Sequence, residues 1–194
     1  MMARELDKTD MRRVICEAGR CAVLKGREIW GGPNDNDMRE EFLTALMAVE
    51  LHNVLGEPVR TELKYHAIYR VLAESSSGER IKGERADVVI GKMEGDKFVS
   101  TKIIEVKKFA ENASVANIVA DLDKSRSINS AVHVDIYAGV LVCQISTAAL
   151  DERKKMLENA LNSEIVYSDE ECSKSKQWRW SFACLQRPSN VAVI

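Results

Sequence analysis

The chain has 194 residues, of which 45% are hydrophobic and 30% charged, and its formal net charge is −2. This composition is typical of a globular protein and excludes disordered and fibrous classes. The length suits one well-buried domain spanning 1–194. Non-specific attraction to nucleic acid usually requires a more basic chain, so any such binding must use a local patch.

No segment predicts a membrane span or a secretion signal, because apolar runs are short and the first residues are polar. The five cysteines are scattered and form no CxxC pair. We therefore expect reduced thiols in a cytoplasmic protein that is not bound to a membrane. The three histidines share no spacing typical of a zinc site.

Two helices are predicted before the first extended segment. The first covers about 10–25 and is expected to end at Gly26, since glycine often follows a helix. The second covers about 38–53 and is closed near Gly56. Residues 59–72 are rich in β-branched and aromatic side chains, which favours an extended segment.

The middle of the chain predicts a β-hairpin. Residues 85–92 and 97–107 flank a turn at 94–96. Further elements are expected in the order helix, strand, helix, strand, strand, starting near 112 or 114 and continuing over 132–143, 147–161, 164–168 and 177–185. A meander followed by a crossover predicts an α/β fold with a mixed central β-sheet flanked by helices on both sides.

The hairpin brings two acids together. With the turn centred near residue 96, cross-strand partners have numbers that sum to about 192, which pairs Asp87 with Glu105. Glu105 and Lys107 point to the same face, because side chains alternate along a strand. Both acids interrupt apolar strands, where an unpaired charge is costly to bury. A bound cation relieves the repulsion between two such carboxylates, so the pattern predicts a metal site.

The metal that such oxygen ligands favour is Mg²⁺, for which Mn²⁺ can substitute. A lysine beside it can position or deprotonate the attacking water, or stabilise the charge that develops on phosphate. The predicted chemistry is phosphodiester hydrolysis by a metal-activated water. The simpler interpretation is a solvated strand face with an ordinary Glu–Lys pair, since an E-x-K triplet alone is a weak signal in a charged chain.

A further acid lies on the second predicted helix. At about 100° per residue, Phe42, Leu43, Leu46 and Val49 define an apolar arc, and Glu50 falls inside it. A glutamate in a buried stripe needs a partner, which is either a nearby metal site or a basic side chain at the edge of the core. Glu40 lies near the edge of the arc and is expected to belong to a capping box.

These residues resemble the PD-(D/E)xK nuclease superfamily, which is restriction endonuclease-like. The resemblance rests on Arg85-Ala-Asp87, on Glu105-Val-Lys107 and on the helix that bears Glu50, with Ala86 in place of the family's proline. It implies an α-β-β-β-α-β core over about 38–143, with the N-terminal helix and the C-terminal elements as additions.

For the site, the resemblance implies that Asp87, Glu105, Lys107 and Glu50 are catalytic. It also implies that Asp87, Glu105, Glu50 and Val106 hold the metal. Asp121 and Lys124 resemble positions from which members of some subfamilies contact the site, although an exposed ion pair is the simpler interpretation.

The leading functional hypothesis is a Mg²⁺-dependent nuclease of the restriction or repair type, acting on nucleic acid, with DNA expected. A homodimer is compatible with it, because many nucleases that cut both strands are dimers. The alternative is a catalytically silent protein of the same fold that binds nucleic acid or a protein partner. A third hypothesis is an unrelated α/β binding domain.

Overall fold

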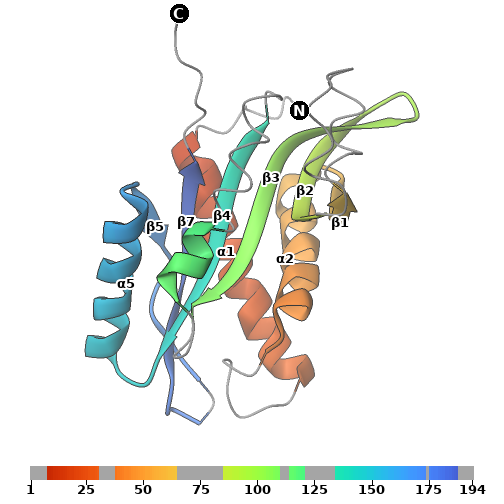
Figure 1. Ribbon diagram of the computed structural model, residues 1–194. Helices are drawn as coiled ribbons and strands as arrows, with labels where there is room; N and C mark the ends of the chain where they lie inside the picture. Colours follow the sequence, from red (N-terminus) through yellow and green to blue (C-terminus); the bar gives the residue numbers. More distant parts are fainter. Residues whose placement is uncertain are drawn as a thin grey trace, which may run out of the picture.

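The computed structural model describes residues 8–30, 38–64, 85–109, 114–120, 134–173 and 175–187. These residues form an α/β fold built on one mixed seven-stranded sheet, with helices on both of its faces (Figure 1). The predicted fold class is therefore confirmed. The likeness to one particular nuclease core remains a prediction.

The first three strands form an antiparallel meander at one side of the sheet. They are β1 (Val59–Lys64), β2 (Arg85–Glu94) and β3 (Lys97–Phe109). Of the extended segment predicted over 59–72, residues 65–72 lie outside the described part of the chain. β2 and β3 carry Asp87 and Glu105, so the meander supplies the main strands of the candidate site.

The remaining strands continue the sheet beyond β3. β4 (Asp135–Gln144) lies parallel to β3, and β7 (Arg179–Arg187) pairs antiparallel with β4. β5 (Ile165–Tyr167) and the two-residue β6 (Glu171–Cys172) both pair with β7, and β6 was not expected from the sequence. The sheet order is β1-β2-β3-β4-β7-β5. A parallel β3–β4 pair needs a crossover, and the helical residues 115–120 lie within it.

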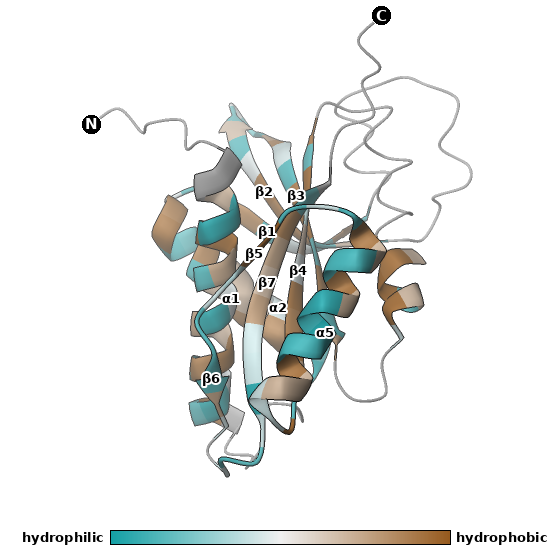
Figure 2. Cartoon of the chain, turned by 90° about the vertical axis from the view of Figure 1, so that its left-hand side faces the viewer, coloured by the Kyte–Doolittle hydropathy of each residue, from teal (hydrophilic) through white to brown (hydrophobic). Residues whose placement is uncertain are grey.

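Helices make the two outer layers. α1 (Lys8–Trp30) and α2 (Glu40–Leu55) cover one face, while α5 (Thr147–Leu161) and the helical residues 115–120 cover the other (Figures 1 and 2). Each layer packs on its own hydrophobic cluster, because the side chains of β4 and β7 alternate between the two faces. Figure 2 shows these strands as largely hydrophobic between the helical layers.

The expectation that Gly26 ends the first helix is wrong, because α1 continues to Trp30. A Cβ on Gly26 would lie 2.3 Å from the Met38 side chain and 3.1 Å from Leu46. The glycine therefore allows α1 to approach the start of α2 closely. By contrast, Gly56 caps α2 in the left-handed conformation, with φ 66° and a hydrogen bond to the His52 carbonyl, as the sequence predicts.

The hairpin between β2 and β3 contains a β-bulge. Near the turn, Glu94 pairs with Lys97 and Gly91 with Ser100, but Ile90 pairs with Lys102. Thr101 is thus the extra residue, and its hydroxyl donates to the Ile90 carbonyl at 3.2 Å. The bulge shifts the register by one, so that Val88 pairs with Ile104. The expected register is therefore confirmed up to the pair next to Asp87 and Glu105.

Candidate functional site

The candidate site begins where the ladder between β2 and β3 ends. Val88–Ile104 is the last pair of the ladder, and Asp87 and Glu105 come next in the same register. Instead of its backbone, Asp87 uses its carboxylate, which accepts a hydrogen bond from the Val106 N–H at 2.7 Å. The Asp87 side chain is 19% exposed, so it remains open to solvent while it closes this strand edge.

The backbone of Val106 faces Asp87 with both of its polar groups. Within a strand, the N–H and C=O of one residue point to the same side. Since the Val106 N–H points at Asp87, the Val106 carbonyl oxygen faces the same side of β3. An acidic oxygen and a carbonyl oxygen therefore lie next to each other at the edge of β3.

Lys107 links this edge to the beginning of α2. Its Nζ lies 3.8 Å from an Asp87 carboxylate oxygen and 3.4 Å from Glu40 Oε1. The second oxygen of Glu40 accepts the Lys108 N–H at 3.2 Å. Asp87 and Glu40 thus bind alternate backbone N–H groups of β3, and the lysine between them contacts both carboxylates.

Glu105 lies on the same face of β3 as Lys107 and Ile103, because side chains alternate along a strand. Glu105 is only 6% exposed. The structure therefore brings Asp87, Lys107 and the Val106 backbone into contact, and Glu105 lies two residues from Lys107 on β3.

The structure does not bring Glu50 to this group. Its carboxylate accepts a hydrogen bond from Lys25 Nζ of α1 at 2.6 Å, and this bond raises the pKa of Lys25. Glu50 lies about 15 Å along α2 from Glu40, because a helix rises about 1.5 Å per residue. Glu50 therefore has the basic partner at the edge of the core that the sequence left open as the alternative to a metal, and Glu40 is the α2 acid that contacts Lys107.

Sequence reasoning missed Glu40 because α2 is apolar on most of its surface. The expected arc included Val49, which is 53% exposed, whereas the buried residues of α2 are Leu43, Thr44, Met47, Ala48, Glu50 and Leu51. On a helical wheel with about 100° per residue, the buried residues lie on both sides of Glu40. Glu40 therefore points to the buried face of α2. The expected capping box is not formed, because the N-cap residue is Arg39, whose side chain makes no capping hydrogen bond.

Carboxylate and carbonyl oxygens, as on Asp87 and Val106, are the type of ligand that Mg²⁺ uses in proteins. Magnesium is commonly bound by one or two carboxylates and completed by water and phosphate. Asp87, Glu105 and the Val106 carbonyl offer such a set. Within the described ranges, three or more His, Cys, Asp or Glu side chains nowhere gather closely enough to form a metal cage by themselves. Asp121 and Lys124 lie outside those ranges.

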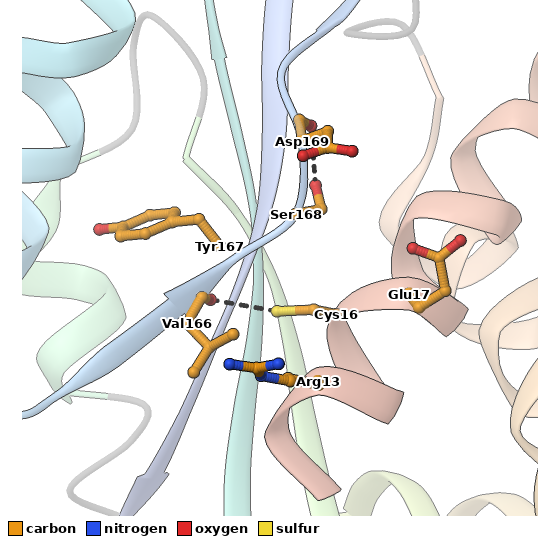
Figure 3. Close-up of a pocket in the computed structure, with 7 residues that line it drawn as sticks. All are labelled: Arg13, Cys16, Glu17, Val166, Tyr167, Ser168 and Asp169. Carbon is orange, nitrogen blue, oxygen red and sulfur yellow. Dashed lines mark hydrogen bonds between the residues drawn. The ribbon is translucent and has the colours of Figure 1, made fainter. Parts of the chain in front are cut away.

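A separate hollow of about 360 Å³ lies between α1 and β5 (Figure 3). Its lining includes Arg13, Glu17 and Asp169, and the Cys16 thiol donates to the Val166 carbonyl at 3.1 Å. Two acids beside one arginine make a poor site for a polyanion. None of the predicted catalytic residues lines this hollow, so the end of β3 is the better candidate.

Comparisons with protein-family models, curated proteins and solved structures found no match to this chain. The fold and site therefore define the class only as an α/β protein with a carboxylate-rich strand edge. Within the described part of the chain, no helix combines the length and the apolar character needed to cross a membrane.

Proposed function

We propose that the protein is a Mg²⁺-dependent nuclease that hydrolyses phosphodiester bonds, with DNA as the substrate. The observation that carries the proposal is the position of Lys107, whose ammonium contacts the carboxylates of Asp87 and Glu40. Glu105 lies on the same strand face two residues away. This combination of acids, backbone carbonyl and lysine supports phosphoryl chemistry better than any other described part of the chain.

In this proposal each residue has a separate task. Asp87, Glu105 and the Val106 carbonyl would hold Mg²⁺, which when bound polarises a phosphate oxygen and makes a bound water more acidic. Lys107 donates hydrogen bonds to the phosphate oxygens that become more negative during the reaction. Glu40 orients the Lys107 ammonium, because it accepts from Lys107 at 3.4 Å.

One observation favours a second candidate function, a silent scaffold that binds nucleic acid or protein. Asp87 and Glu40 each bind a backbone N–H of β3 beyond the last β2 pair. Carboxylates in those positions stabilise an unpaired strand edge without any chemistry. Under this alternative, the acids affect stability and have no effect on phosphodiester bonds.

Cleavage assays separate the two candidates. Wild-type protein is incubated with plasmid, linear, branched and single-stranded DNA, and with RNA, in the presence of Mg²⁺ or Mn²⁺. We expect cleavage that disappears with EDTA and in Glu105→Ala and Lys107→Ala. Cleavage that persists unchanged in both variants would come from another site or a contaminant. Double-strand breaks from single encounters would indicate that two copies of the chain act together.

Metal binding is measured independently of cleavage. Isothermal titration with Mn²⁺ compares wild type with Asp87→Ala, and Glu50→Ala is the matched control because its carboxylate pairs with Lys25. We expect weaker binding in Asp87→Ala only. Equal binding by wild type and Asp87→Ala would rule out the proposed metal site.

A further inference from the structure

The start of α2 is held by β3. The Lys108 ammonium donates to the Met38 carbonyl at 2.8 Å, and the Lys108 N–H donates to Glu40 at 3.2 Å. Met38 is 1% exposed, so this contact lies against the core. The N-cap residue Arg39 contributes no side-chain hydrogen bond to the helix. The first turn of α2 is therefore positioned from outside the helix.

Adjacent lysines act on this turn from different directions. Lys107 binds Oε1 of Glu40, whereas Lys108 binds Oε2 with its backbone and Met38 with its side chain. Met38 lies two residues before α2, next to the N-cap Arg39, so the bond to its carbonyl restrains the chain where it enters the helix, close to Glu40. The distance between Glu40 and Lys107 thus depends in part on the bonds that Lys108 makes at the start of α2.

We infer that Lys108 is a positioning residue, which holds the first turn of α2 so that Glu40 stays within reach of Lys107. The inference rests on the proposed nuclease function. It assigns Lys108 a different role from that of a phosphate-binding lysine. Its ammonium is directed at a backbone carbonyl, so its contribution to catalysis passes through Glu40.

The first test compares three variants at temperatures well below their melting points. Lys108→Met removes the ammonium, Lys108→Arg restores a donor, and Lys102→Met is the control. Lys102 is also on β3, but it pairs with Glu57 beyond the other end of α2, at 3.8 Å. We expect kcat to fall about 10- to 100-fold in Lys108→Met with KM nearly unchanged, as for residues that orient a site. Lys108→Arg should recover most of the loss, and Lys102→Met should match wild type.

Two results would overturn the inference. One is a raised KM together with a salt dependence of DNA binding that is weaker by about one unit of slope, which indicates a direct phosphate contact. The other is that the losses caused by Lys108→Met and Glu40→Gln add up in the double variant. In a Glu40→Gln background, Lys108→Met should cost little more, because both changes affect the same step; full, additive loss would show that Lys108 acts elsewhere.

A second readout needs no catalysis. Hydrogen exchange of the first amides of α2 should be faster in Lys108→Met than in Lys102→Met. Unchanged exchange rates would show that the contact with Lys108 does not restrain the start of α2. If the wild-type protein cuts no substrate, the proposed function fails; faster exchange would then support the constraint alone and remove its catalytic role.

Discussion

The two halves of α2 hold glutamates in different settings. Glu40, in the first turn, meets Lys107 and the backbone of β3, and its side chain is 39% exposed. The side chain of Glu50 is only 11% exposed, and it pairs with Lys25 of the neighbouring helix. Burial alone therefore does not tell which element supplies the partner of an acid. The partner that an acid reaches across the fold distinguishes the candidate site from the scaffold.

The largest expected difference is between the lysine partners of the two glutamates, Lys107 and Lys25. Lys107→Met should lower cleavage about 10²- to 10³-fold, because it removes a donor to the reacting phosphate. Lys25→Met removes the same charge from the partner of Glu50 and should leave cleavage unchanged. Steady-state rates on the preferred substrate check this. Similar losses in both variants would place the two halves of α2 in one functional unit.

The next largest effect is on stability and concerns the packing of α2, which both glutamates share. Met47 is fully buried between them and lies in the cluster under α1 and α2. Met47→Ala should destabilise the fold by about 3 kcal/mol through the lost contacts and the cavity. Val49→Ala, on the exposed side, should change stability by less than about 0.5 kcal/mol. Urea unfolding measures both, and equal effects would mean that α2 packs on the sheet by another face.

The comparison itself is tested by exchanging the two glutamates for glutamine. Glu40→Gln should lower kcat about 10- to 100-fold, because Lys107 loses a charged partner. Glu50→Gln should leave kcat at the wild-type value and reduce stability only slightly, because the lysine end of the pair is exposed to solvent. The reverse pattern would return Glu50 to the site and contradict the assignment of Glu40.

The smallest effect concerns the pH dependence of the Glu50 setting. Its hydrogen bond raises the pKa of Lys25 above the ordinary 10.5. A raised folded-state pKa stabilises the protein fully below the unfolded value, and the contribution is lost as pH rises through the folded value. The small difference in urea midpoint between wild type and Lys25→Met should therefore be present at neutral pH and shrink in strong alkali. A difference that grows with pH would contradict the pairing.

Local patterns in the sequence predicted most of the fold and part of the site. Gly56 predicted the end of α2, and alternation placed Glu105 and Lys107 on one face. The pairing near the turn, continued along the hairpin, would be offset by one residue at Asp87 and Glu105. The bulge at Thr101 removes this offset. Gly91 carried a signal for that bulge, because a Cβ there would lie 2.4 Å from the Val99 carbonyl oxygen.

The choice between Glu40 and Glu50 could not be made from the sequence. Lys25 is distant from Glu50 in the chain, and only the packing of α1 on α2 brings the two together. Glu40 likewise depends on where β3 ends relative to α2. Helical periodicity predicts only which face of a helix is buried. For α2 it predicted that face poorly, because the helix has few polar residues.

The bulge at Thr101 also has a practical consequence for labelling the protein. The turn residues Gly95 and Asp96 are exposed and lie roughly 30–33 Å along β3 from Glu105, at about 3.3 Å per residue. Because the register is reset at Thr101, a dye or short tag inserted at the turn is separated from the acids by an independently fixed stretch of ladder. The hairpin tip is thus a suitable attachment point for a dye or tag that leaves the candidate site undisturbed.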